Sequence, residues 1–557
     1  MENAAISDNF SLLGKLIDIH GEDSFKAKSY SSSSFTIDKL PVQLSTLTPE
    51  KIFSLKGIGQ NTGKKIIEQI ETGRLSVLDD YIRKTPIGVF ELLNIKGLGP
   101  KKIAKIWKEL GIESVGELLY ACEENRLLLY KGFGEKTQQN IKDSITYYLS
   151  NQGSYLYGQI ENFARAFSLK LKDTFPGKII EITGDFNRQM EIIDKLEWVT
   201  DIKVQELIAF FIAINYKVEI ADKTIVAKGE DNVILHVHCT NTDTLSSLLF
   251  EKNCSPEFLK FWQTKFGNHI PAHISDEETF KHFSLPYIPV CYREKEIAII
   301  QALENKLPKL ITTADIKGII HSHSDWSDGR DSIEVMAQNA IAKGYEYLVI
   351  SDHSQTAFYA NGLYPERIKA QHDLINELNE KYKPFKIFKS IESDILNDGR
   401  LDYSDEILSS FDLVIASIHS NLRMPEEKAM MRLLNAIANP YTTILGHMTG
   451  RLLLSRNGYP VNYATIIDAC AKHKVVIELN AHSRRLDIDW RHIYDATEAG
   501  VLISIDPDAH YTMGFDDIRY GVLVAQKGGL TAQQNLSSFS LIEFETYLKT
   551  NRTFLPQ

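Results

Sequence analysis

The chain has 557 residues, of which 43% are hydrophobic and 24% are charged. At roughly 150 residues per domain this length predicts three or four domains, and the composition excludes a disordered, collagen-like or disulfide-stapled chain. Lys and Arg number 62 against 73 Asp and Glu, and the net charge of −11 argues against nucleic-acid binding over the whole surface. Residues 51–150 nevertheless hold 16 basic and 12 acidic side chains, so a polyanion contact is expected there or at bound cations.

Three features of the sequence bear on the cellular compartment in which the protein acts. The longest apolar run, 207–214, is far shorter than the ~20 residues that a membrane span needs. The first residues, MENAAISDNF, have neither the basic nor the apolar region of a secretory signal. The five cysteines form no CxxC pair, which argues against a disulfide framework and a thiolate zinc site. We therefore expect a cytoplasmic protein without membrane contact.

Three short segments near the N-terminus repeat one pattern. LKGIG at 55–59, IKGLG at 95–99 and YKGFG at 130–134 are each followed by a polar helix start. Two glycines allow a tight turn that a ligand can approach closely, and the following helix N-terminus favours an anion. The candidate contacts with a phosphate backbone are Gly57, Gly59, Gly97, Gly99, Gly132, Gly134, Lys56, Lys96 and Lys131.

This repeated pattern resembles the helix-hairpin-helix, which binds DNA phosphates without reading the base sequence. The alternative is a helical bundle in which the glycines only cap helices. Three copies favour DNA binding, and contacts to the phosphate backbone carry no base information. We therefore predict DNA as the partner, bound without sequence preference, whereas the sequence identifies no protein partner.

The rest of the chain alternates strands and helices. Residues 151–300 contain strand-like runs at 178–183, 224–227 and 233–237, and LPYIP at 285–289 is typical of a linker. From 311 onward short apolar runs are separated by helical stretches, which is typical of buried parallel strands in repeated βα units and predicts a closed barrel. The runs lie at 347–350, 385–388, 413–416, 443–445, 475–479 and 501–505.

Histidines and carboxylates follow these runs, where the active-site residues of a βα barrel lie. Imidazole and carboxylate donors suit zinc, manganese or iron, and a pair spaced as HxH can meet one ion. A lone histidine is usually a core or surface residue, but a set placed repeatedly after strands predicts a multinuclear metal site. The candidate ligands are His321, His323, Asp328, His353, Glu392, His419, His447, Asp508 and His510.

The segments HSHSDWSDG, ISDHS, IESDILNDGRLDY, SIHS, GHMTGR and DPDAH resemble the successive motifs of the polymerase and histidinol phosphatase (PHP) family. With the N-terminal repeats they resemble bacterial family X DNA polymerases, which carry a C-terminal PHP 3′-5′ exonuclease. The resemblance covers nearly the whole chain and is most specific at 311–525. It implies an all-α helix-hairpin-helix region (8-kDa-like and fingers) at 1–150, an α+β nucleotidyltransferase-like palm and thumb at 151–300, and a distorted α/β PHP barrel at 311–557.

The resemblance also implies three divalent metal ions, either zinc or manganese, with iron as a further choice. Metals at the family's spacing turn a bridging water into hydroxide and clamp the phosphate oxygens. The implied ligand sets are His321, His323, Glu392 and Asp508 for the first ion, Glu392, His419 and His447 for the second, and Asp328, His353 and His510 for the third.

Two further side chains each allow two interpretations. Arg451, in GHMTGR, is placed to contact a substrate phosphate, and the alternative is a structural salt bridge. Lys65 follows the first glycine repeat, where some relatives in the family have a Schiff-base lysine that removes deoxyribose phosphate. The alternative for Lys65 is a solvated helix lysine that contacts phosphate.

The palm region departs from the family pattern. A family X palm uses three carboxylates to hold two Mg²⁺ ions. Two of these carboxylates belong to a DxD motif that follows a Gly-Ser pair. Here Asp185 stands at the Ser position, and Lys195 and Glu197 stand at the DxD positions. Leu235 and His236 lie where the third carboxylate belongs. We therefore expect a degenerate palm that holds DNA and adds no nucleotide.

These observations favour a DNA-binding, metal-dependent 3′-5′ exonuclease or phosphodiesterase in DNA repair. A second interpretation is an active, gap-filling family X polymerase with an exonuclease, which needs the palm metals. A third is a PHP phosphomonoesterase such as histidinol phosphatase, for which the DNA-binding repeats have no use. A non-enzymatic DNA scaffold would leave nine candidate ligands unexplained.

Overall fold

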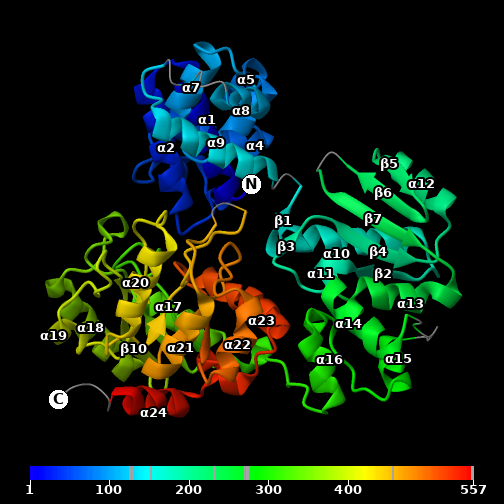
Figure 1. The fold of residues 1–557 in the computed structure, drawn as a ribbon. Helices are drawn as coiled ribbons and strands as arrows, with labels where there is room; N and C mark the ends of the chain where they lie inside the picture. Colours follow the sequence, from blue (N-terminus) through cyan, green and yellow to red (C-terminus); the bar gives the residue numbers. More distant parts are fainter. Residues whose placement is uncertain are drawn as a thin grey trace. The chain divides into compact units, whose positions relative to one another are not determined.

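The computed structural model describes residues 1–123, 127, 130–150, 153–229, 232–268, 270, 275–454 and 457–552. They form two compact units, Met1–Gln152 and Gly153–Gln557 (Figure 1). No helix among these residues is both long and apolar enough to cross a lipid bilayer.

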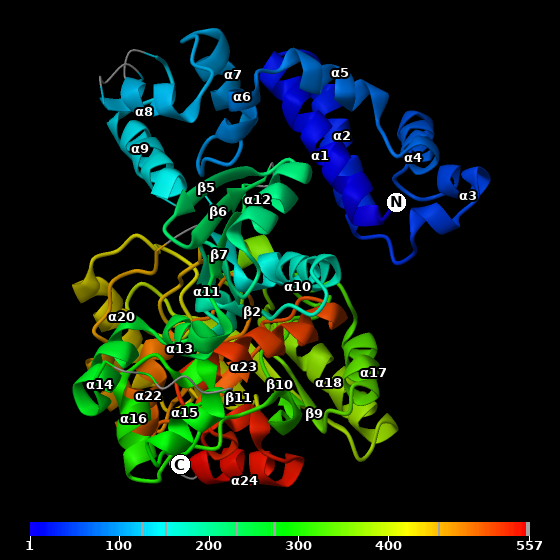
Figure 2. The same ribbon diagram turned by 90° about the vertical axis from the view of Figure 1, so that its right-hand side faces the viewer.

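The first unit is all α-helical, as expected, and is drawn in blue and cyan in Figure 2. Every one of its α-helices contributes buried apolar side chains to one core. The helices are α1 (Asn3–His20), α2 (Ser24–Asp38), α3 (Pro49–Phe53), α4 (Gln60–Thr72), α5 (Ser76–Lys84), α6 (Ile87–Leu92), α7 (Pro100–Lys108), α8 (Val115–Glu123) and α9 (Glu135–Ser150).

The second unit begins with a five-stranded mixed sheet of order β2-β4-β7-β6-β5. Its pairs are antiparallel except β4 with β7, and the apolar side chains of one face form a core with α10 and α12. We call this part the palm. Its elements are β1 (Tyr155–Leu156), α10 (Tyr157–Thr174), β2 (Ile180–Thr183), α11 (Gly184–Asn187), β3 (Ile192–Ile193), β4 (Leu196–Thr200), α12 (Val204–Ala213), β5 (Lys217–Ala221), β6 (Thr224–Lys228), β7 (Ile234–Cys239) and α13 (Thr242–Lys252).

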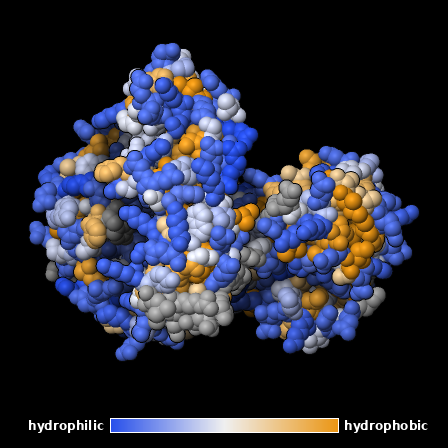
Figure 3. Space-filling view, turned by 90° about the horizontal axis from the view of Figure 1, so that it is seen from above, coloured by the Kyte–Doolittle hydropathy of each residue, from blue (hydrophilic) through white to orange (hydrophobic). Residues whose placement is uncertain are grey.

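The palm carries exposed apolar side chains. Leu169 on α10, Ile212 on α12 and Ile220 on β5 are 61%, 62% and 56% exposed. Figure 3 shows a hydrophobic area on its right-hand part, on the side where Figure 1 labels α12 and β5. The next helices form a separate small core around Trp262. They are α14 (Pro256–Phe266), α15 (Asp276–His282) and α16 (Glu296–Leu303).

Seven parallel strands then form a nearly closed barrel in sequence order, as expected. A parallel bridge between Ser322 and Ala509 links the first strand's end to the last strand's end. Within a strand, alternate residues face opposite ways: Leu348 and Ile350 pack with the outer helices, whereas Tyr347 and Val349 face inward. The strands are β8 (Gly318–Ile319), β9 (Tyr347–Ile350), β10 (Lys386–Asp394), β11 (Leu413–Ser417), β12 (Ile444–Leu445), β13 (Val476–Asn480) and β14 (Ile503–Asp506).

Helices surround the barrel, and the last one closes its lower end. Phe544 and Leu548 of α24 join the inward-facing side chains of the strands in one core. In Figure 1 this helix lies at the bottom, in red. The helices are α17 (Ile333–Ala342), α18 (Pro365–Lys381), α19 (Asp405–Leu408), α20 (Glu426–Ile437), α21 (Tyr463–His473), α22 (Ile493–Glu498), α23 (Ile518–Lys527) and α24 (Leu541–Arg552).

The palm is joined to the barrel through buried charges. Lys527 of α23, whose side chain is fully buried, donates to Glu294 Oε1 at 2.8 Å and to the Arg188 carbonyl at 2.7 Å. Arg188 Nε donates to the same Glu294 oxygen at 3.0 Å. Trp490 Nε1 donates to Glu191 at 3.0 Å from the barrel side. Glu294 thus pairs with two cationic side chains, those of Lys527 and Arg188, that are buried away from water.

Replacing Glu294 with Gln is expected to destabilise this unit by about 3–5 kcal/mol, because a buried lysine loses its counter-charge. Calorimetry should show a thermal midpoint about 3–6 °C lower. The control is Glu304→Gln, since Glu304 pairs with Lys306 at 2.9 Å on the surface, where side chains are 52% and 72% exposed. That change should cost less than about 1 kcal/mol. Equal shifts of the thermal midpoint in the two variants would contradict the assignment of Glu294 as the buried counter-charge of Lys527.

Candidate metal centre

The carboxyl ends of the barrel strands bring all nine candidate ligands together. Glu392 lies within β10, and the others lie in the segments that follow the strands. His321 and His323 follow β8, His353 follows β9, and His419 follows β11. The parallel direction of the strands places these segments at one end of the barrel.

The carboxylate of Glu392 is the centre of the cluster and is 1% exposed. Five imidazoles surround its two oxygens. Oε1 lies 3.0 Å from His447 Nε2, 3.2 Å from His419 Nε2 and 3.3 Å from His321 Nε2, and Oε2 lies 3.0 Å from His353 Nδ1 and 3.6 Å from His323 Nε2.

The remaining carboxylates complete the cluster. Asp508 Oδ1 lies 3.1 Å from His323 Nε2, and Asp328 lies 3.5 Å from His510 Nε2 and 3.6 Å from His353 Nε2. The groups whose donor atoms lie within 4.8 Å of one another are His323, Asp328, His353 and His510, then His321, His323 and Asp508, and then His353, Glu392 and His419. His323 therefore faces two of the expected ion positions, and His353 faces Glu392 as well as Asp328.

Backbone strain marks three of the nine positions. The φ angles of His321, His447 and Asp508 are 58°, 20° and 51°, in the left-handed region that non-glycine residues rarely adopt. Such strain persists only where the surrounding structure over-determines it, and it concentrates at functional sites. At His321 and Asp508 the strained backbone directs the side chains toward Glu392 and His323.

Buried donor atoms without hydrogen-bond partners test whether the residues fit metal ions. His321 Nε2, His323 Nε2 and Glu392 Oε2 have almost no solvent contact and no hydrogen-bond partner among the described residues. Leaving such atoms without partners is costly, whereas coordination to a cation satisfies them. Neutral imidazole and ionised carboxylate form the ligand set of zinc, manganese and iron. The residues fit bound metal.

The electrostatics of the cluster agree with this fit. Burial raises the pKa of Glu392, but His419 and His321 outweigh it and hold the pKa well below its usual range. Burial, with His510 and His353 nearby, lowers the pKa of His323 to about 3, so that this imidazole is neutral. Burial lowers the pKa of His419, but the charge of Glu392 and hydrogen bonds to carboxylates outweigh it and raise the pKa to about 10. Without metal, the carboxylates of the cluster favour a proton on His419. Divalent cations bound between the same side chains would supply the positive charge instead.

A second layer of carboxylates orients the ligands. Glu478, fully buried in β13, accepts from His321 Nδ1 at 2.6 Å and from the amide of His447 at 3.2 Å. Asp394 accepts from His419 Nδ1. Such partners fix which imidazole nitrogen faces a metal. Glu478 was not among the expected site residues, although a glutamate inside the apolar run VVIELN is a signal that could have identified it.

Arg451 forms a salt bridge with Asp489. Its Nη1 lies 2.6 Å from Asp489, its Nε donates to the Arg485 carbonyl at 2.9 Å, and its Nη2 donates to the Leu486 carbonyl. These contacts agree with the structural alternative, and a phosphate contact by Arg451 stays a prediction. The guanidinium of Arg485 lies close to a candidate ligand, with Nε 3.6 Å from Asp508 Oδ2.

The three glycine repeats of the first unit form turns between helices. The first glycine of each repeat is left-handed, with φ of 87° at Gly57, 87° at Gly97 and 102° at Gly132. Gly59 and Gly99 have ordinary φ angles and are the N-caps of α4 and α7. A methyl group on either would meet nothing within 4 Å, and the same holds for Gly134. Neither packing nor backbone conformation requires these second glycines, so they leave room for a ligand at a helix N-terminus.

The other expected contacts of the first unit lie around these turns. Lys56, Lys96 and Lys131 are exposed. A hollow of about 420 Å³ at the first turn is lined by Gly57, Gly59 and polar side chains of α2 and α4. Lys65 is half-buried in α4, with Nζ 5.9 Å from the centre of the Tyr30 ring. The lyase role of Lys65 stays a prediction.

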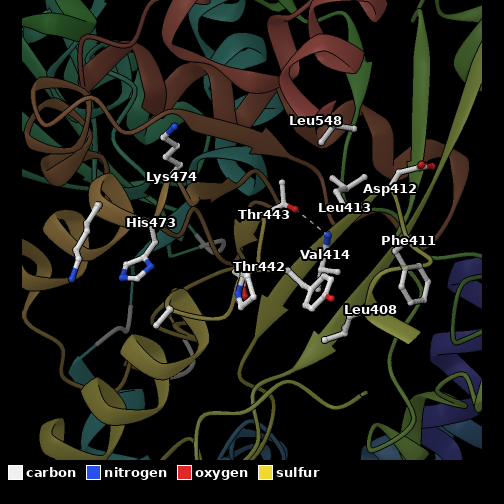
Figure 4. A pocket seen from close by; sticks show the side chains of 14 residues that line it. Leu408, Phe411, Asp412, Leu413, Val414, Thr442, Thr443, His473, Lys474 and Leu548 are labelled. Carbon is white, nitrogen blue, oxygen red and sulfur yellow. Dashed lines mark hydrogen bonds between the residues drawn. The ribbon is translucent and has the colours of Figure 1, made fainter. Parts of the chain in front are cut away.

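Another cavity, of about 250 Å³, lies at the opposite end of the barrel strands (Figure 4). Leu413 and Val414 at the start of β11 and Thr443 just before β12 line it. His419 and His447 follow the other ends of these strands. This cavity is therefore separate from the metal cluster.

The residues that the palm presents at its expected catalytic positions are Asp185, Lys195, Glu197 and His236. Lys195 Nζ lies 2.9 Å from Glu197 Oε1. Asp185 pairs with Arg188. Glu197 and His236 lie side by side on the parallel strands β4 and β7.

Comparison with known proteins agrees with this geometry. Family models match residues 1–75 as a helix-hairpin-helix domain, 89–146 as a SAM-like helix-hairpin-helix tandem and 320–482 as a PHP domain. The DNA polymerase/3′-5′ exonuclease PolX of Bacillus subtilis is 31% identical over 96% of this chain and 97% of its own length. A probable phosphatase of Caldanaerobacter subterraneus is 30% identical over 31% of this chain and 68% of its own.

The probable phosphatase YcdX of Escherichia coli O81 is 32% identical over 23% of this chain and 54% of its own length. The similarity to PolX instead runs along nearly the whole chain. The chain belongs to the PolX family, the bacterial family X DNA polymerases with a C-terminal PHP domain.

Proposed function

We propose that this protein is a DNA-binding, metal-dependent 3′-5′ exonuclease in DNA repair, whose palm holds DNA without polymerising nucleotides. The observation that carries the proposal is one chain with two features: eight candidate metal ligands around the buried carboxylate of Glu392, and glycine turns with open helix N-termini. The metal cluster supports phosphoester hydrolysis, and the turns support a DNA substrate over a small phosphomonoester.

The nine side chains have distinct roles in this proposal. Divalent zinc, manganese or iron ions, three in number, would supply a nucleophilic hydroxide and charge that stabilises the phosphate oxygens. Glu392 would bridge two ions, because both of its oxygens face imidazoles. Glu478 and Asp394 hold His321 and His419 in the orientation that points Nε2 at the centre. Arg485 is the side chain best placed to neutralise a phosphate beside Asp508.

The turns of the first unit would hold the DNA backbone. Left-handed first glycines let the chain turn sharply, and open second glycines let a phosphate reach the first amides of α4 and α7. Exposed lysines beside the turns add positive charge. Contacts of this kind position the DNA and leave the base sequence unread.

Polymerisation is disfavoured by the palm's charges. Lys195 puts an ammonium group 2.9 Å from Glu197, where the family holds a metal ion between carboxylates. Two like charges about 4 Å apart repel by on the order of 4 kcal/mol at an effective dielectric constant of 20. A gap-filling polymerase is the competing interpretation, supported by the printed name of the Bacillus subtilis relative.

Replacing His353 or Asp508 with Ala is expected to reduce release of nucleotides from 3′ ends by at least about 100-fold, because each change removes a ligand from a preformed site. The measurement uses 5′-labelled single-stranded and gapped DNA with Mn²⁺. The control is His473→Ala, an exposed histidine in the last turn of α21, which should keep the wild-type rate. Wild-type rates in either ligand variant, or a metal-loaded protein that leaves every DNA intact, would overturn the proposal.

Reversing the charge at Lys56, Lys96 and Lys131 by substitution with Glu is expected to weaken DNA binding and to flatten its salt dependence. Each lost phosphate contact reduces the slope of log Kd against log salt by about 0.7–0.9. Fluorescence anisotropy at several salt concentrations gives the slope. Hydrolysis of bis(4-nitrophenyl) phosphate, which needs no DNA contact, should be unchanged.

The matched control for this charge reversal is a second triple variant with Glu at Lys369, Lys383 and Lys472, which are exposed on the barrel outside the palm. It carries the same net charge change and should retain more affinity for DNA than the first triple variant. Equal loss of affinity in the two would mean that only net charge matters and that the glycine turns have no part in binding.

The doubly substituted protein His353→Ala/Asp508→Ala is expected not to extend a primer with dNTPs. Removing both ligands prevents hydrolysis from concealing synthesis, so that the palm is tested alone. Losing about 4 kcal/mol of stabilisation corresponds to roughly a thousandfold in rate. Extension products are separated on a denaturing gel with a labelled primer. Template-directed extension would favour the polymerase interpretation.

A further inference from the structure

The palm holds a second cluster of donor atoms, distinct from the barrel. Glu197 of β4 and His236 and His238 of β7 each offer a donor atom, and these atoms lie within 4.8 Å of one another. The strands are parallel neighbours, with Glu197 opposite His236 in register. We infer that Glu197, His236 and His238 form a binding site for a transition-metal ion such as Zn²⁺.

All three side chains lie on one face of the palm sheet. Alternate residues of a strand face opposite ways, and the intervening Trp198, Leu235 and Val237 pack in the core with α10 and α12. The three donors therefore face away from that core. Glu197 and His238 are 5% and 6% exposed, and His236 is half-buried. The cluster is therefore partly open to solvent at His236 and enclosed at Glu197 and His238.

Neighbouring groups orient the two most buried donors. His238 Nδ1 lies 2.8 Å from the Thr224 hydroxyl, and its Nε2 lies 3.1 Å from Glu197 Oε1. When Nδ1 donates its hydrogen to Thr224, the lone pair of Nε2 faces a carboxylate oxygen, and a cation between them satisfies both. Gly184 fixes Glu197 from the other side, since a methyl group there would lie 2.3 Å from Glu197 Oε2.

The donor set selects the kind of metal. Mg²⁺ requires oxygen ligands in octahedral geometry, whereas two imidazoles and one carboxylate are a common ligand set for Zn²⁺. Three protein ligands leave a fourth position for water. Lys195 is the competing cation, because its Nζ shares Glu197 Oε1 with His238. Its side chain is 35% exposed, so a bound ion requires Lys195 to turn toward solvent. The two imidazoles then suit Zn²⁺ and leave the palm without the oxygen ligands that the Mg²⁺ ions of nucleotidyl transfer require.

The test is the zinc content of the full-length protein after zinc loading and dialysis. His236→Ala should hold one equivalent less than the wild-type protein, since the barrel cluster is untouched. His473→Ala, which removes an exposed histidine outside both clusters, should hold the wild-type amount. Equal zinc in the wild-type and His236→Ala proteins would overturn the inference.

A second variant keeps the inference testable if His236→Ala fails to fold. Lys195→Met removes the competing ammonium group and keeps the length of the side chain. Competition with a chromogenic chelator should show zinc affinity at the weakest site rising roughly tenfold or more, because a like charge beside the ion is gone. Unchanged affinity in Lys195→Met would argue that no ion binds beside Glu197.

Discussion

The arrangement of side chains at the carboxyl end of the barrel depends on one buried carboxylate, that of Glu392. Glu392 has 1% of its surface exposed and faces five imidazoles, and an ionised carboxylate is stable there only if positive charge is close. Protons on the histidines or bound cations can supply that charge, and coordination to cations would satisfy the nitrogens of His321 and His323 that have no hydrogen-bond partner among the described residues. The strained backbone at His321 and Asp508 and the buried carboxylate of Glu478 follow from the same requirement, because each directs a donor at the centre.

The same rule applies where the palm joins the barrel. Glu294 lies between Lys527 and Arg188, all three in a region nearly closed to water, so that each charge depends on its neighbours. Arg491 and Trp490 of the barrel reach Glu191 of the palm. Glu191 of the palm thus neutralises Arg491 of the barrel, which gives the palm a structural role independent of nucleotidyl transfer.

How far the sequence predicts this structure depends on the range of the interactions. Apolar runs between helices predicted the parallel strands, and the residues after them predicted which candidate ligands lie together, because both depend on local pattern and strand direction. The eight apolar residues at 207–214 did not indicate whether they form a helix or a strand, because a continuous apolar run has neither the helical nor the strand periodicity. In the structure they lie largely in helix α12. The link between Glu478 and His321 joins residues far apart in the chain, and the sharing of His323 between two ligand groups depends on loop paths that spacing does not describe.

Two HxH pairs in this chain have different surroundings, and the difference determines what each can bind. His321 and His323 stand beyond the end of β8, where loops from other strands bring further imidazoles and the carboxylates of Glu392 and Asp508 around them. His236 and His238 stand within β7, where the parallel neighbour β4 supplies Glu197, and that carboxylate also pairs with Lys195. The barrel thus gathers nine candidate ligands from the ends of many strands, whereas the palm cluster has three donors from two adjacent strands.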